Sequence, residues 1–329
     1  MTTEKTRRWW KSAAVRLAGS AVALGVLLWL LPLDELWGAM RRLPLWVFLV
    51  TLAGYMCTHA VAVLKWRMMV NTAGAGLSIA LSARCYFAGL FGNVFLPSLV
   101  GGDLIRAGLA MRSARHRAGA LLASLVDRVL DLAALGLLAG FGALMVPRAL
   151  DERSRHVFFI LAAAVALIAV GVAALVMLFP PRRFSTKHRR KLVKLRQAVR
   201  AIARGRGRVA AAFAIAVGTQ GSFALLNAWI ATWCGLDVPL YVWLFVWPLG
   251  KLSAMAPATQ GGIGVREAAL VALLLPFGVA PALTFAVGLL WQLVVISGGL
   301  LGGGIAALAA RRIFTAEDAE GAEAVKIGS

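Results

Sequence analysis

The sequence predicts an all-α polytopic membrane protein. Hydrophobic residues make up 60% of its 329 residues and the mean hydropathy is +0.81, whereas a soluble domain is about 45–50% apolar. The apolar runs are continuous rather than alternating, which favours membrane-spanning helices over β-strands. A Pro-x3-Gly-Gly-x3-Arg pattern also occurs twice inside these runs. We therefore expect about six full transmembrane helices and two re-entrant broken-helix segments in an inverted repeat.

The repeated pattern runs from Pro97 to Arg106 in its first copy and from Pro257 to Arg266 in its second. Pro lacks a backbone donor and Gly has a low helix propensity, so each copy should interrupt a helix. A bilayer tolerates interrupted backbone only where it is buried in protein or lines a wet cavity. Matching interruptions in two halves of a membrane protein are typical of a transport site. Two Gly-rich loops without such a role are the simpler alternative.

The order of apolar and basic segments predicts the topology. Basic residues at 1–12 and 311–312, and twelve Lys or Arg without an acid at 180–208, indicate cytoplasmic segments. Both termini are therefore expected on the cytoplasmic side. Three crossings separate the two interruptions, and this odd number inverts the second copy of the pattern relative to the first. Six apolar stretches are long enough for full crossings: 13–31, 45–64, 118–146, 157–179, 209–231 and 282–310.

The expected domain organisation is a single integral membrane domain over residues 1–312. Its first half covers about 13–146 and its second half about 157–310. Residues 180–208 form a basic cytoplasmic segment, which is either a loop that sets the topology or a helix lying on anionic headgroups. Residues 313–329 contain four acids and are expected to be a disordered tail.

The formal net charge of +21 does not point to nucleic acid, because the basic residues flank apolar spans. Membrane orientation and contact with anionic lipid explain it better. The three cysteines and four histidines show no metal-ligand spacing, so we expect no metal and no cofactor. We expect the protein in a bacterial inner (cytoplasmic) membrane, with homo-oligomerisation left open.

The two interruptions offer groups that bind an anion, because backbone N–H groups and the helix dipole at a half-helix start favour negative charge. Asp103 is placed to cap the first half-helix, with Arg106 in its first turn. Arg266 takes the matching place in the second, beside Glu267. A charge at the bilayer centre costs about 2.5–3.5 kcal/mol or more, and a phosphate would compensate both Arg side chains.

Simpler explanations exist for both arginines. Arg106 is alternatively a residue that only sets the topology, and Arg266 alternatively pairs with Glu267 or another acid. Paired glycines would let backbone approach the ligand. The residues expected to bind substrate are Asn93, Gly101, Gly102, Asp103, Arg106, Lys251, Gly261, Gly262, Arg266 and Glu267.

A second charged group lies in the expected span 118–146. Asp127 and Asp131 are four residues apart and share a helix face, while Arg128 can reach Asp131. These three residues are candidates for a proton- or cation-responsive site coupled to transport. A self-neutralising structural cluster is the alternative.

The pattern Asn93-x3-Pro-x3-Gly-Gly-Asp-x2-Arg106, the following Ser124-x2-Asp-Arg-x2-Asp131, and the stretch from Pro257 to Glu267 resemble one known family. This is the transmembrane region of the lysylphosphatidylglycerol synthetase/flippase family, and the resemblance covers residues 13–310. It implies movement of a modified phospholipid between leaflets. The family's aminoacyl transfer belongs to a separate soluble domain that this sequence does not include, so that activity is not carried over.

The residues and the resemblance together predict a flippase-like lipid translocase rather than an enzyme. It would move the headgroup of an anionic phospholipid or a lipid phosphate, with membrane lipid and not nucleic acid as its partner. Two alternatives remain open. One is a membrane-embedded enzyme that modifies a lipid with Asp127 or Glu267 as acid or base, and the other is a transporter of a water-soluble anion.

Overall fold

The computed structural model describes most of the chain, including helices on both sides of Pro97 and of Pro257. The expected spans 13–31 and 157–179 lie outside the described residues, and so do the residues around Pro97 and Pro257. The described parts are Asp34, Trp37, Gly38, 41–95, 99–145, 186–255 and 263–327.

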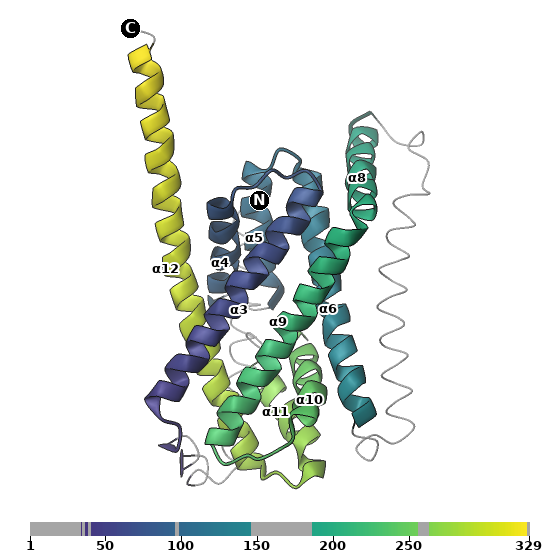
Figure 1. Ribbon diagram of the computed structural model, residues 1–329, viewed down its shortest axis with the longest axis vertical. Helices are drawn as coiled ribbons and strands as arrows, with labels where there is room; N and C mark the ends of the chain where they lie inside the picture. The colour runs from purple at the N-terminus through teal and green to yellow at the C-terminus, as the bar shows by residue number, and fades with distance from the viewer. Residues whose placement is uncertain are drawn as a thin grey trace, which may run out of the picture.

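Every regular element in these described parts is a helix, which confirms the all-α prediction (Figure 1). The elements in chain order are α3 (Leu45–Thr72), α4 (Ile79–Phe95), α5 (Leu99–Ser113), α6 (Arg117–Met145), α8 (Thr186–Arg204), α9 (Arg206–Trp233), α10 (Leu240–Ser253), α11 (Val265–Leu274), the short 3-10 helix η3 (Leu275–Phe277) and α12 (Pro281–Ile327).

Three helices in the described residues are long and apolar enough to cross a membrane: Leu45–Thr72, Arg206–Trp233 and Pro281–Ala310. They fall on the expected spans at 45–64, 209–231 and 282–310. Helix α6 covers the expected span 118–146 as one continuous helix of 29 residues. The chain is thus a multi-pass membrane protein.

The two halves of the chain repeat one order of elements and pack reciprocally. In each half a long helix precedes two shorter helices, and a second long helix follows. Helix α3 packs against its counterpart α9, while α12 packs against α4 and α6 packs against α10. The pair α4 and α5 lies in the upper half of Figure 1, and the pair α10 and α11 lies in the lower half. The first short helix of each half therefore rests on the last long helix of the other half, whereas α5 and α11 pack against the long helices of their own halves.

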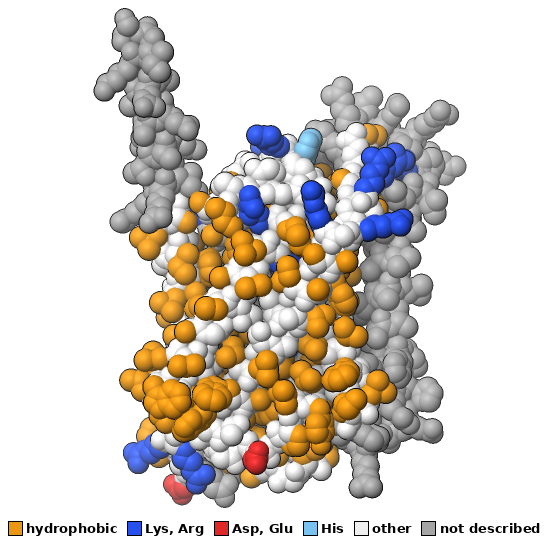
Figure 2. Space-filling model, in the orientation of Figure 1, with side chains coloured by type: hydrophobic (Ala, Val, Ile, Leu, Met, Phe, Trp, Pro, Cys, Tyr) orange, Lys and Arg blue, Asp and Glu red, His pale blue; other side chains and the backbone are white. Residues whose placement is uncertain are grey.

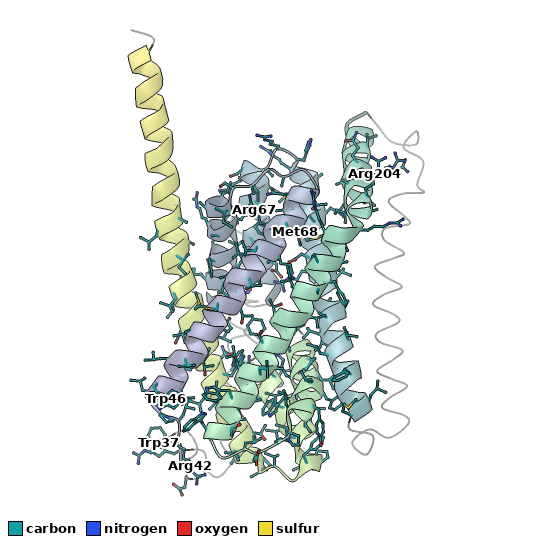
Figure 3. The ribbon with its side chains drawn as sticks, viewed as in Figure 1. Trp37, Arg42, Trp46, Arg67, Met68 and Arg204 are labelled. Carbon is teal, nitrogen blue, oxygen red and sulfur yellow. The ribbon has the colours of Figure 1, made fainter. Side chains whose placement is uncertain are left out.

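The outer surface is apolar around the middle of the bundle, and charged side chains gather at its two ends (Figure 2). Arg67 and Arg204 mark the upper end, whereas Trp37, Arg42 and Trp46 mark the lower end (Figure 3). An apolar band between charged or aromatic ends is what a bilayer requires of the protein that it surrounds.

The basic segment 180–208 contains helix α8, which favours the helical alternative for it. Ala198 and Ile202 of α8 are buried in a core cluster with Trp66 of α3, so one apolar face holds this helix against the bundle. Helix α12 continues to Ile327 and includes most of the tail at 313–329, which was expected to be disordered. Ala and Glu are frequent in this stretch and are strong helix formers.

Glycine sets the contact between α6 and α10. A Cβ atom added at Gly142 would lie 2.5 Å from the backbone nitrogen of Phe245 and 2.8 Å from its Cα. Backbone cannot withdraw as a flexible side chain can, so this contact requires glycine. Gly136 lies on the same helix, and a Cβ there would meet nothing within 4 Å.

We expect Gly142→Ala to destabilise the protein by about 1–3 kcal/mol, because it overpacks the contact between α6 and α10. Gly136→Ala is the matched control, and it should be neutral or stabilising by up to about 1 kcal/mol because Ala has the higher helix propensity. Thermal unfolding of both variants in detergent measures the difference. Equal melting temperatures for the two variants would contradict the described contact.

Candidate functional site

A cavity of about 200 Å³ lies between the two halves of the protein. Helices α3, α4, α5, α6, α9, α10, α11 and α12 all contribute to its lining. The cavity brings together seven residues that the sequence singled out for substrate binding or coupling: Asn93, Asp103, Arg106, Arg128, Asp131, Lys251 and Arg266.

The remaining candidates take other places. Asp127 and Glu267 are almost completely buried beside the cavity and are not part of its lining. Gly101 and Gly102 lie on α5 and do not line it either. Gly261 and Gly262 fall outside the described residues.

Six charged side chains from the first half form one network. Arg106 lies 3.3 Å from Asp103 and 3.6 Å from Asp127, and Arg128 pairs with Asp103 and, at 3.8 Å, with Asp131. Lys65 completes the network by pairing with Asp131 and, at 3.1 Å, with Asp127. Three bases thus balance three acids. Such pairing is what allows charges to stay ionised in an apolar interior.

Lys65 is the member of this network that sequence reasoning missed. Its position near the end of an apolar run is typical of a residue that sets membrane orientation. In the structure it is only 1% exposed and points to α6, where it pairs with two carboxylates. The acid pair Asp127 and Asp131 could have pointed to Lys65. Two carboxylates in an apolar span require a second base besides Arg128 to balance their charge.

The second half holds a smaller group of charges. Arg266 pairs with Glu267 and donates a hydrogen bond to Oε1 of Gln292 at 2.9 Å. Glu267 also accepts a hydrogen bond at 2.7 Å from the backbone N–H of Gly264, which precedes α11 with φ of +86°. This arrangement satisfies a backbone donor at the helix start, as a capping box does. Glu267 thus binds a backbone donor at the start of α11, and its role in substrate binding stays a prediction.

The corresponding expectation for the first half is wrong. Helix α5 begins at Leu99, before the paired glycines, so Asp103 lies inside the helix and does not cap it. Arg106 consequently lies two turns into α5, whereas Arg266 lies in the first turn of α11. Asp103 instead pairs with Arg106 and Arg128. The two copies of the pattern therefore have different local structures.

Gly102 shows why the helix continues through the first glycine pair. A Cβ atom at this position would collide with the carbonyl oxygen of Gly89 and with Oδ1 of Asn93 on α4. The N–H of Gly102 donates to that Asn93 oxygen at 3.0 Å. The glycine therefore serves contact between α4 and α5, and its amide is already bonded rather than open to a ligand.

Lys251 differs from the other bases around the cavity, because it has no carboxylate partner among the described residues. Its ammonium group donates to Oε1 of Gln220 on α9 at 2.7 Å and lies 4.7 Å from the centre of the Phe223 ring. Both partners are uncharged, so neither offsets the positive charge. Gln220 is thus a buried hydrogen-bonding residue that lines the cavity.

Aromatic rings form much of the remaining wall. Trp247 and Trp291 meet edge to face with their centres 5.0 Å apart, and Tyr55 meets Trp291 in the same way at 5.7 Å. The hydroxyl of Tyr86 hydrogen-bonds to Nδ1 of His59 at 3.1 Å, and the guanidinium of Arg106 lies 5.1 Å from the Tyr86 ring centre. Aromatic faces stabilise a neighbouring cation without neutralising it.

Several buried donors in the lining side chains have no hydrogen-bond acceptor within the described part of the chain. These include the Nε atoms of Arg106, Arg128 and Arg266, Nη2 of Arg106 and the indole Nε1 of Trp247. A buried donor without an acceptor costs about 1–3 kcal/mol. The surplus of donors suits a ligand that only accepts hydrogen bonds.

The fold and site define a multi-pass helical membrane protein with a charged cavity between two interlocked halves. The chain belongs to the family described as the lysylphosphatidylglycerol synthase TM region, whose model matches residues 16–303. This match confirms the resemblance found in the sequence motifs, and the family links the chain to membrane lipids. No curated protein and no solved structure matches it.

Removing Lys65 should destabilise the protein strongly. Lys65→Met leaves buried Asp127 and Asp131 without one of their bases, which costs about 3–5 kcal/mol. The double variant Lys65→Met with Asp131→Asn restores the balance of charges and should recover much of the loss. Exposed Arg112 on α5 supplies the control Arg112→Met. Thermal unfolding in detergent measures all three variants, and wild-type stability of the single variant would show that the network contributes nothing.

Proposed function

We propose that this protein is a flippase-like lipid translocase and not an enzyme. The observation that carries the proposal is the meeting of Arg106 and Arg266, from two separate interruptions of the chain, in one cavity between the halves. The cavity takes the phosphate-bearing headgroup of an anionic phospholipid or lipid phosphate, while the acyl chains remain in the surrounding bilayer.

The chemistry of the cavity wall supports a phosphate. Phosphate oxygens only accept hydrogen bonds, and the buried Nε atoms of Arg106, Arg128 and Arg266 are donors without acceptors. Arg128 is the most accessible base of the first-half network, since 40% of its side chain is exposed. Arg106 and Arg128 both pair with Asp103. A bound phosphate competes with this carboxylate for the same guanidinium groups, so binding and rearrangement of the network are linked.

The placement of the broken segments supports alternating access to the cavity. Helices α4 and α5 approach it from one end of the bundle, and α10 and α11 approach it from the other (Figure 1). In transporters with inverted repeats, motion of one half relative to the other opens a central site to each side in turn. We extend this arrangement to the present chain, with both termini in the cytoplasm of a bacterial cell.

The carboxylates of the site argue for translocation over lipid modification. Asp127 lies against Lys65 and Arg106, and Glu267 is held by Arg266 and the Gly264 N–H. Neither carboxylate is part of the cavity lining, so neither is placed to take a proton from a bound substrate. The family's link to membrane lipids likewise favours a lipid over a water-soluble anion.

Neutralising the second-half pair should slow translocation strongly without unfolding the protein. The double variant Arg266→Gln with Glu267→Gln removes both charges together, and the new amide oxygen at 267 can still accept from the Gly264 N–H. We expect the translocation rate to fall at least about tenfold, since a hydrogen bond to a charged group contributes about 1.5–3 kcal/mol.

The rate is measured in proteoliposomes as the loss of fluorescent lipid from the leaflet that an impermeant quencher reaches. Arg112→Gln, on the exposed side of α5, is the control and should keep the wild-type rate. Undiminished activity of the double variant, with its fold intact by thermal unfolding, would remove Arg266 from the site.

The inverted arrangement makes a separate prediction about labelling. Exposed Ser113 is the last residue of α5, and exposed Ala280 follows the pair formed by α10 and α11. In a background in which exposed Cys57 is replaced by Ser, Ser113→Cys should react with an impermeant thiol reagent only from the cytoplasmic side and Ala280→Cys only from the opposite side. Reaction of both from one face would rule out the inverted topology.

A further inference from the structure

We infer that the cavity selects a headgroup with a single net negative charge, and that Lys251 sets this selectivity. The preferred ligand is a phosphodiester whose second alcohol is uncharged. This inference rests on the proposed translocase function, and it names the class of lipid that the same site accepts.

The balance of charges around the cavity is the starting point. The first-half network contains three bases and three acids, all in contact with one another. Arg266 and Glu267 in the second half form a further neutral pair. Among the described residues at the site, these pairs leave Lys251 as the cation that takes part in no ion pair. The charged side chains at the cavity therefore sum to a surplus of one positive charge.

The position of Lys251 holds this charge at the cavity. It lies in the last turn of α10, where the helix dipole favours a cation. Gln220 of α9 fixes its ammonium group by a hydrogen bond that does not neutralise it. Trp247 lies four residues earlier on the same face of α10, also lines the cavity, and has a buried indole N–H without an acceptor. Lys251 and Trp247 thus present a cation and a neutral donor on one helix face.

The surplus charge distinguishes three kinds of phospholipid. A phosphodiester with an uncharged alcohol carries one negative charge and neutralises Lys251. A zwitterionic lipid brings an additional cation, which finds Asp103, Asp127, Asp131 and Glu267 already paired. A phosphomonoester is mostly dianionic at pH 7, because its second pKa is about 6, and it leaves one negative charge uncompensated in an apolar interior.

The experiment compares three fluorescent lipids in proteoliposomes at pH 7: phosphatidylglycerol with one negative charge, zwitterionic phosphatidylcholine, and phosphatidic acid. We expect the wild-type protein to move phosphatidylglycerol about tenfold faster than either of the others, the factor that corresponds to about 1.4 kcal/mol. Lys251→Gln should remove the preference for phosphatidylglycerol over phosphatidylcholine, and Lys251→Arg should retain it.

A second measurement does not depend on transport. Short-chain phosphatidylglycerol should raise the melting temperature of the detergent-solubilised wild type and the Lys251→Arg variant, and it should raise that of Lys251→Gln much less. Equal rates for all three lipids with the wild type would overturn the charge selectivity while leaving translocation intact. An unchanged preference in Lys251→Gln would overturn the role of Lys251. Failure of the wild type to move any of the lipids would instead count against the proposed function itself.

Discussion

The structure depends on pairing charges that an apolar bundle would otherwise exclude. Lys65, Arg106 and Asp127 are each less than 5% exposed, and each lies within ion-pair distance of an opposite charge. A single unpaired charge in such surroundings costs several kcal/mol, so the partners have to be in place together. This requirement joins α3, α5 and α6 at one point. It also explains why charged side chains line the cavity inside the bundle, although the outer surface around the middle of the bundle is apolar.

The same requirement shapes the relation between the two copies of the Pro-x3-Gly-Gly-x3-Arg pattern. In the second copy Arg266 finds its acid in the next residue, and α11 starts beside it. In the first copy the residue after Arg106 is Ala107, so its partners come from Asp103 on the same helix and Asp127 on α6. The helix extends through the glycines to present Asp103 to both Arg106 and Arg128. The two copies therefore have the same sequence spacing but different local structures. The arginine of each copy nevertheless reaches the same cavity.

Sequence reasoning predicted the parts of the fold and site that depend on local pattern. The long apolar helices follow from composition, and the family follows from motifs around Asp103 and Glu267. The partner of Asp127 could not be predicted in this way, because Lys65 lies 62 positions earlier and looks like a topology signal. The same limit applies to the contact of Lys251 with Gln220 on α9, since tertiary packing determines which distant side chains meet. Helix starts near glycine depend on such packing too, as Gly102 illustrates.

The reciprocal packing of α12 on α4 and of α6 on α10 has a consequence for biosynthesis. When the first half has emerged from the ribosome, α4 still lacks the long helix that will cover it, and the wall that the second half supplies to the cavity does not yet exist. The charged network is then assembled before its surroundings are complete. The last long helix closes the molecule, so a chain cut short before α12 leaves Phe87, Leu90 and Val94 of α4 without the glycine-lined helix that packs against them. The packing surface of α4 and the wall of the cavity are consequently both completed only when the final long helix arrives.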